Sequence, residues 1–186
     1  DEFAQKFDFS NVLRRIDGID TCQKESNKPF DDNKFEKELL KKVHRTIEKP
    51  NSPVKITETI KNVNRSFGTL ISGEIAKYYG DKGLPENSIT FNLDGIAGQS
   101  FGAFLSKGMS LYLNGSGNDY VGKGMNGGKI IINPLHQGEK FGGAGNTCLY
   151  GATGGKLYVR AAVGERFAVR NSGATAVVEG TGDNAC

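Results

Sequence analysis

Residues near the middle of the chain have the spacing of a phosphate-binding loop. Gly117, Gly122 and Lys123 match the pattern G-x-x-x-x-G-K, in which backbone N–H groups and a lysine hold phosphate oxygens. That pattern also needs Ser or Thr next, to reach a magnesium ion, and a helix that begins at the loop. Here Gly124 follows Lys123, and the run Lys129–Asn133 predicts a strand. We therefore expect no nucleotide at this loop.

A second glycine pattern overlaps the first. Gly122, Gly124 and Gly127 spell G-x-G-x-x-G, the fingerprint of a dinucleotide-binding turn. That fingerprint must lie between a strand and a helix, and again a strand is predicted to follow. In a glycine-rich stretch such a match arises easily by chance, so it predicts no cofactor.

Four acidic residues could supply an acid and a base for polysaccharide hydrolysis, namely Asp119, Glu165, Glu179 and Asp183. Glycosidases need a pair of carboxyl groups on either side of the bond they cleave. Nothing in the spacing of these four requires any two of them to meet. Charges of this kind usually lie on a solvated surface.

Cysteine and histidine are scarce. Cys22, Cys148 and Cys186 are odd in number and widely spaced, which fits neither a disulfide framework nor a zinc site. Cys148 has neither histidine near it in the sequence and is expected to be a small core residue, and His44 and His136 are expected to be solvated. We therefore predict no catalytic, cofactor-binding or metal-binding residue in the chain.

The charge balance excludes some classes of partner. Lys and Arg number 24 and Asp and Glu 21, for a net charge of +3 over 186 residues. So small an excess predicts neither nucleic acid nor an anionic membrane as partner. The first residues lack the pattern of a signal peptide, and no apolar run could span a bilayer. We expect an intracellular protein, cytoplasmic or in an organelle. Because the chain does not begin with Met, we expect a processed fragment.

Glycine separates two kinds of sequence, because Gly18 is the only one of the 26 glycines that precedes Phe67. In the glycine-poor part, apolar residues recur at helical spacing and predict an amphipathic helix over about 32–49. A second, short helix is expected over Ser72–Tyr79, and Gly80 ends it. The apolar residues of the first helix are Phe35, Leu39, Leu40, Val43 and Ile47.

The glycine-rich part repeats a strand followed by glycine turns. The expected strands begin roughly 20 residues apart, a period typical of stacked repeats, and the chain is therefore predicted to be mainly β and to form a parallel β-helix. They are Ser88–Leu93, Ser110–Leu113, Lys129–Asn133, Lys156–Arg160 and Thr175–Glu179, after an earlier strand containing Val54, Ile56 and Ile60. The glycines expected at sharp turns are Gly115, Gly117, Gly122, Gly124, Gly127, Gly128, Gly151 and Gly173. Arg166 and Arg170 are candidates for binding carbonyls at a corner or for contact with an adjoining domain.

Several motifs, in order, closely resemble the C-terminal domain, of the GXGXG type, of the glutamate synthase large subunit. The resemblance covers about Ile56 to Cys186, which sets the expected domains at 1–55 (an extension) and 56–186. The matching segments are Asn64–Gly68, Leu70–Ala76, Gly98–Phe104, Asn118–Met125, Gly127–Ile130, Gly145–Gly155, Gly164–Gly173 and Ala176–Gly180.

This resemblance implies a right-handed β-helix inside an iron–sulfur flavoprotein. In that family an amidotransferase domain releases ammonia from glutamine, and an FMN-binding barrel uses it to convert 2-oxoglutarate to glutamate. The parent is an oxidoreductase acting on CH-NH2 donors and carries FMN and an iron–sulfur cluster. The implied role of this domain is a non-catalytic scaffold. Its implied partners are the other domains of the large subunit and a small subunit or electron-donor protein.

The sequence departs from the family pattern in places. Asp183 is followed by Asn184–Cys186 where the family continues Gly-Asp-His-Gly-Cys-Glu-Tyr, and Ala161 and Ala162 replace a glycine and a basic residue. Two other hypotheses remain open. One is a stand-alone β-helix protein that binds or degrades polysaccharide. The other is a structural subunit of another oxidoreductase complex, such as formylmethanofuran dehydrogenase.

Overall fold

A computed structural model describes residues 4–14, 16–18, 24–27, 33–134 and 142–185. The chain forms two compact units, Asp1–Asp32 and Asn33–Cys186. The first contains a short 3-10 helix, η1 (Ala4–Lys6), followed by Phe7 and Phe9, whose exposed rings stack with centroids 6.0 Å apart. Everything that follows concerns the second unit.

Two α-helices form where the sequence predicts them. Helix α1 spans Lys34–Glu48 and helix α2 spans Thr69–Tyr79, followed by the 3-10 helix η2 (Gly80–Lys82). Leu39, Val43 and Ile47 of α1 are buried, and the Tyr79 hydroxyl donates a hydrogen bond to the Ile47 carbonyl at 2.6 Å. The amphipathic stripe therefore packs against α2. Asp31 and Asp32 precede α1 and are of a residue type that caps helices, but both lie outside the described residues.

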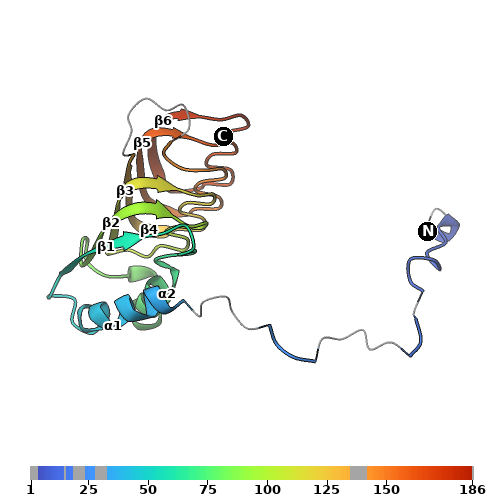
Figure 1. Ribbon diagram of the computed structural model, residues 1–186, viewed down its shortest axis with the longest axis horizontal. Helices are drawn as coiled ribbons and strands as arrows, with labels where there is room; N and C mark the ends of the chain where they lie inside the picture. Colours follow the sequence, from blue (N-terminus) through green and yellow to red (C-terminus); the bar gives the residue numbers. More distant parts are fainter. Residues whose placement is uncertain (1–3, 15, 19–23, 28–32, 135–141, 186) are drawn as a thin grey trace. The chain divides into compact units, whose positions relative to one another are not determined.

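Six strands form one sheet, in which every strand is parallel to its neighbours and the order β1-β2-β3-β4-β5-β6 follows the chain. Each segment predicted to be a strand overlaps one of these six strands. Figure 1 shows the strands stacked from β1 to β6, with α1 and α2 at the β1 end. The strands are β1 (Val54–Ile60), β2 (Ile89–Ala97), β3 (Met109–Gly117), β4 (Asn126–Asn133), β5 (Gly154–Val163) and β6 (Thr175–Thr181).

The core lies on one face of this sheet, because alternate side chains point inward. Phe91, Leu111, Ile130 and Leu157 are partners in the register of successive strands, and all four are fully buried. The same register stacks Leu93, Leu113, Ile132 and Val159. Each strand thus stacks its inward apolar side chains on those of the strands before and after it.

The segments that return the chain from one strand to the next cover the other side of the core. We call residues 98–108, 118–125, 142–153 and 164–174 the return segments. Their buried residues include Phe101, Val121 and Cys148, which follow one another on neighbouring segments. The N–H groups of Gly122, Leu149 and Ala168 donate to the carbonyls of Phe101, Val121 and Cys148 at 2.9, 2.8 and 2.8 Å.

The predicted fold class, a right-handed parallel β-helix, is wrong. The strands form a single open parallel sheet, whereas a β-helix needs further sheets along its return path. The reason is the backbone of the return segments, where a left-handed conformation recurs at every second residue and is incompatible with a strand. The left-handed residues are Ser100, Gly102 and Phe104; Tyr120, Gly122 and Gly124; Thr147, Leu149 and Gly151; and Arg166, Ala168 and Arg170. The mainly β content of the prediction is partly consistent with the structure, and the two expected helices are present.

Candidate functional site

The predicted turn glycines occupy two kinds of position. Gly115 and Gly117 lie in β3, and Gly127 and Gly128 in β4, whereas the others lie in return segments. Gly115 has φ 147°, and a Cβ there would collide with the carbonyl of Gly95 on β2. These glycines in the sheet therefore allow neighbouring backbones to approach closely. The predicted glycines with positive φ are Gly115, Gly122, Gly124, Gly128 and Gly151.

The phosphate-loop pattern begins at Gly117, the last residue of β3, and continues into the second return segment, which leads into β4. The Lys123 ammonium lies 5.5 Å from the ring centroid of Tyr120 and 6.0 Å from that of Phe104. Cation–π contacts of this length attract modestly at an exposed site. The lysine that a nucleotide would need is therefore engaged with two aromatic rings.

The acidic candidates divide between the return segments and the sheet. Asp119 Oδ1 accepts a hydrogen bond from the Asn146 N–H at 2.7 Å, and Asn146 Oδ1 accepts one from the Glu165 N–H at 2.8 Å. Glu179 lies instead in β6, and the Asp183 carbonyl accepts from the N–H of Arg166 at 2.9 Å. The Asp119 carboxylate thus caps backbone between return segments, a structural use.

The remaining candidates are placed as follows. Arg166 and Arg170 are both exposed, with φ 56° and 59°, in the segment between β5 and β6. The Cys148 thiol is buried, which raises its pKa to about 12, and it donates to the Gly145 carbonyl at 3.3 Å. His44 lies 3.7 Å from Glu48 on the surface of α1. His136, Cys22 and Cys186 lie outside the described residues. Within the described ranges, no three His, Cys, Asp or Glu residues gather as a metal site.

A buried carboxylate that sequence reasoning missed joins the two helices. Glu36 of α1 is only 5% exposed, and its Oε1 accepts hydrogen bonds from the N–H groups of Gly68 at 3.0 Å and Ile71 at 3.1 Å. Those N–H groups open α2, where unpaired donors and the helix dipole favour an acceptor. Burial outweighs these bonds and raises the pKa of Glu36 to about 7. Its spacing from Leu39, Leu40 and Val43 places it on the apolar stripe, a signal that could have revealed it.

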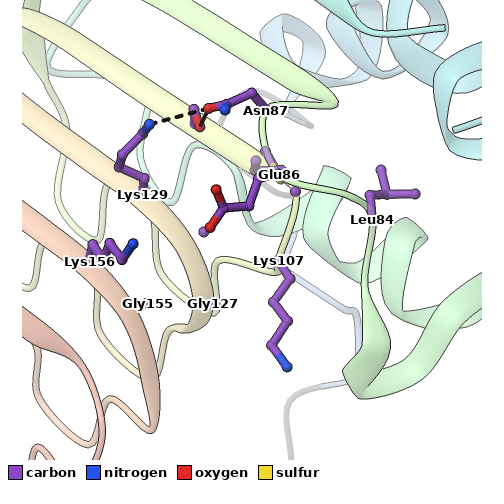
Figure 2. A pocket seen from close by; sticks show the side chains of 12 residues that line it. Leu84, Glu86, Asn87, Lys107, Gly127, Lys129, Gly155 and Lys156 are labelled. Atoms are coloured by element: carbon purple, nitrogen blue, oxygen red, sulfur yellow. Dashed lines mark hydrogen bonds between the residues drawn. The ribbon is translucent and has the colours of Figure 1, made fainter. Parts of the chain in front are cut away.

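A pocket of about 290 Å³ opens at the amino-terminal ends of β3, β4 and β5. Its residues come from consecutive strands and from the segment before β2, as Figure 2 shows. Lys107, Lys129 and Lys156 line it together with one acid, Glu86. The sequence pattern did not predict it, because the lysines lie far apart in the chain and meet only through strand register. The other lining residues are Leu84, Asn87, Gly108, Met109, Ser110, Gly127, Gly128 and Gly155.

The fold and the site define a glycine-rich domain with a parallel β-sheet. Its return segments form hydrogen bonds mainly with one another. Comparison with known proteins gives the family. The family model described as the GXGXG motif matches residues 32–186, and the chain belongs to this family.

The relatives are glutamate synthases. The chain is 45% identical to the glutamate synthase [NADPH] large chain of Bacillus subtilis over 98% of its own length, but it covers 12% of that protein. It is 56% identical to ferredoxin-dependent glutamate synthase 2 of Synechocystis over 70% of its length and 8% of the relative, and 47% identical to glutamate synthase [NADH] of Schizosaccharomyces pombe over 82% and 7%. The chain thus corresponds to about a tenth of these proteins. In the part of the chain that the structure describes, no helix combines the length and apolarity that crossing a membrane takes.

Proposed function

We propose that the chain is the GXGXG domain of a glutamate synthase large chain, and that it acts there as a non-catalytic scaffold between the domains that carry out the chemistry. The observation that carries this proposal is the 45% identity to a large chain across 98% of the residues. The parent enzyme would make glutamate from glutamine and 2-oxoglutarate. Its FMN and iron–sulfur cluster would be held by other domains.

The packing suits a spacer that must hold a fixed length. At about 4.8 Å per strand, six strands span roughly 24 Å from β1 to β6. A single apolar core runs from α1 through all six strands. The Phe67 ring lies at one end of it, edge-on to Phe91 at 5.3 Å and stacked on Phe101 at 6.0 Å. A sheet on one side of this core and hydrogen-bonded return segments on the other resist bending.

The names of the relatives also support a role apart from electron supply. They specify NADPH, NADH or ferredoxin, yet the segment they share with this chain is 45 to 56% identical in the three relatives compared above. A domain that bound the electron donor would be expected to differ among them at its contact surface. We therefore assign the donor, and any small subunit, to contacts with other domains of the large chain.

The boundaries and contacts of the domain within the parent are part of the proposal. Residues 56–186 would form the domain proper, and residues 1–55 an extension that supplies α1. Exposed Arg166 and Arg170 would meet a neighbouring domain. In the parent chain, Arg166→Glu together with Arg170→Glu should then lower the melting temperature, whereas both changes should leave the isolated chain nearly unaffected.

The scaffold role is tested with the purified chain. We expect one cooperative unfolding transition, no flavin absorbance after incubation with FMN and gel filtration, and no turnover of glutamine or 2-oxoglutarate. Stoichiometric FMN binding or measurable turnover would overturn the proposal. The hypothesis of a polysaccharide-binding protein predicts instead a cluster of acids, whereas Asp119 caps a return segment and Glu179 lies in β6.

A further inference from the structure

The pocket at the amino-terminal ends of β3, β4 and β5 concentrates positive charge on one edge of the sheet. Lys129 of β4 and Lys156 of β5 are direct partners in the parallel register. Like charges directly opposite each other destabilise a sheet. Within the described ranges neither lysine takes part in a salt bridge. The fold therefore places two lysines on neighbouring strands, and no acid of the described residues forms a salt bridge with either.

One of these lysines is held in place. The Lys129 ammonium donates a hydrogen bond to Asn87 Oδ1 at 3.2 Å and lies 5.6 Å from the ring centroid of Tyr112. The Ser110 hydroxyl donates to the same Asn87 oxygen at 2.9 Å. An ammonium has three donors, so Lys129 keeps hydrogen-bonding capacity for a ligand. Because its rotamer is already restricted, a ligand would meet a smaller ordering cost there.

The chain already directs one oxyanion toward these lysines. Figure 2 shows the Glu86 carboxylate turned toward the side of the pocket that carries Lys129 and Lys156, and the Lys107 ammonium turned away from it. No salt bridge joins the Glu86 carboxylate to either ammonium group. The pocket thus has room for a second oxygen-bearing group, and Glu86 would compete with it.

The pocket wall favours a small ligand. Gly127, Gly128 and Gly155 contribute no side chain to it, so the strand edge is open there. A volume of about 290 Å³ lies at the lower end of the range for ligand sites. That is enough for an ion with a few oxygens.

The geometry points to a site for a small oxyanion, a phosphate or a dicarboxylate, held between Lys129 and Lys156 at the edge of β4 and β5. This inference does not depend on the scaffold role, since it concerns the isolated chain. Lys107 lies at the rim and contributes less. Loss of Glu86 strengthens binding, because its charge repels the ligand and its carboxylate competes for the same ammonium groups.

Two probes test the site, inorganic phosphate and succinate, each titrated at constant ionic strength and followed by backbone amide NMR shifts. Lys129→Gln and Lys156→Gln should each weaken binding and raise the dissociation constant about fivefold. Glu86→Gln should strengthen binding and lower the dissociation constant about threefold. The matched control is Lys55→Gln, because Lys55 occupies the same register column, through Thr90 and Ser110, but lies outside the pocket.

The outcomes separate the sources of the oxyanion. Saturable shifts around Gly127 and Gly155 with phosphate alone identify a phosphate site, and with succinate alone a carboxylate site. Either result, with the expected order of variants, supports the proposal. It is overturned by absence of saturation with both probes, or by Lys55→Gln weakening binding as much as Lys156→Gln. Melting curves of each variant show whether the fold is retained.

Discussion

The buried carboxylate of Glu36 gives the sharpest prediction of stability. One oxygen, Oε1, accepts hydrogen bonds from the N–H groups of Gly68 and Ile71 at the start of α2, at 3.0 and 3.1 Å. The change Glu36→Gln keeps a carbonyl oxygen that can take these bonds and removes the ionisable group. The variant is therefore a fixed mimic of the protonated side chain, and the wild type becomes equivalent to it at low pH.

The size and sign of the effect follow from proton linkage. The pKa of Glu36 is raised from 4.5 in a model peptide to about 7 in the fold, mainly by burial. The folded state thus binds the proton more tightly than the unfolded state. The resulting stabilisation is fully present below about pH 4.5 and is lost as pH rises through about 7. At about 1.4 kcal/mol per pKa unit the difference amounts to about 3 kcal/mol.

Urea unfolding followed by circular dichroism between pH 4.5 and 8 measures this effect. We expect Glu36→Gln to match the wild type near pH 4.5 and to become more stable than it by about 3 kcal/mol at pH 8. The control is Glu38→Gln on the same helix, where the side chain is 66% exposed and paired with Lys41 at 2.6 Å. That change should leave the pH dependence unaltered. A Glu36→Gln variant that is less stable than the wild type at pH 8 would refute the reasoning, because it would mean that the charged form is favoured at the start of α2.

Three further predictions concern packing and access. Phe67→Ala removes a ring that contacts the rings of Phe35, Phe91 and Phe101 and should cost about 3 to 5 kcal/mol of unfolding free energy in urea titration. A loss below about 1 kcal/mol would contradict the packing. Gly115→Ala places a methyl group against the Gly95 carbonyl and should lower the free energy of unfolding by at least about 2 kcal/mol. Gly151→Ala, with open space around it, should lower it by about 1 kcal/mol. Equal losses would show that the close approach of Gly115 to Gly95 is unimportant. Cys148 should resist iodoacetamide at pH 8 in the native protein and react after unfolding, as mass spectrometry can show, and rapid native labelling would mean that the thiol is accessible.

The strands could be predicted from the sequence because their pattern is local. Alternation of Val54, Ile56 and Ile60 with polar residues indicates β1, and runs of β-branched residues indicate the later strands. The first helix was found to within two residues at its start and one at its end, and Thr69 begins α2 three residues before the expected start. These errors are the usual ones at helix ends, where caps depend on tertiary contacts.

The return segments could not be predicted, and that is why the fold class was wrong. A strand spacing of roughly 20 residues predicts parallel strands but does not specify the backbone between them. Gly102 and Gly122 suggest a left-handed conformation, whereas Leu149 and Ala168 occupy equivalent positions and normally avoid it. The surrounding hydrogen bonds impose that conformation on them.

Both candidate sites depend on contacts between distant residues. Glu36 meets Gly68 and Ile71 only after α1 packs on α2, and Lys129 meets Lys156 only through strand register. The sequence shows the types of these residues but not their distances. The same limit applies to Asp119, which the sequence offered as an acid for hydrolysis and the structure uses as a backbone cap.

Strand order that follows chain order has a mechanical consequence. Each strand pairs only with the strands before and after it in the sequence. A force that pulls the two ends of the chain apart therefore acts on one strand and its return segment at a time. The half-exposed β6 should detach first, whereas β1 is next to the helices. Each detached unit of about 20 residues would release roughly 65 Å of chain. Under load the domain would therefore lengthen in regular steps from its carboxyl-terminal end.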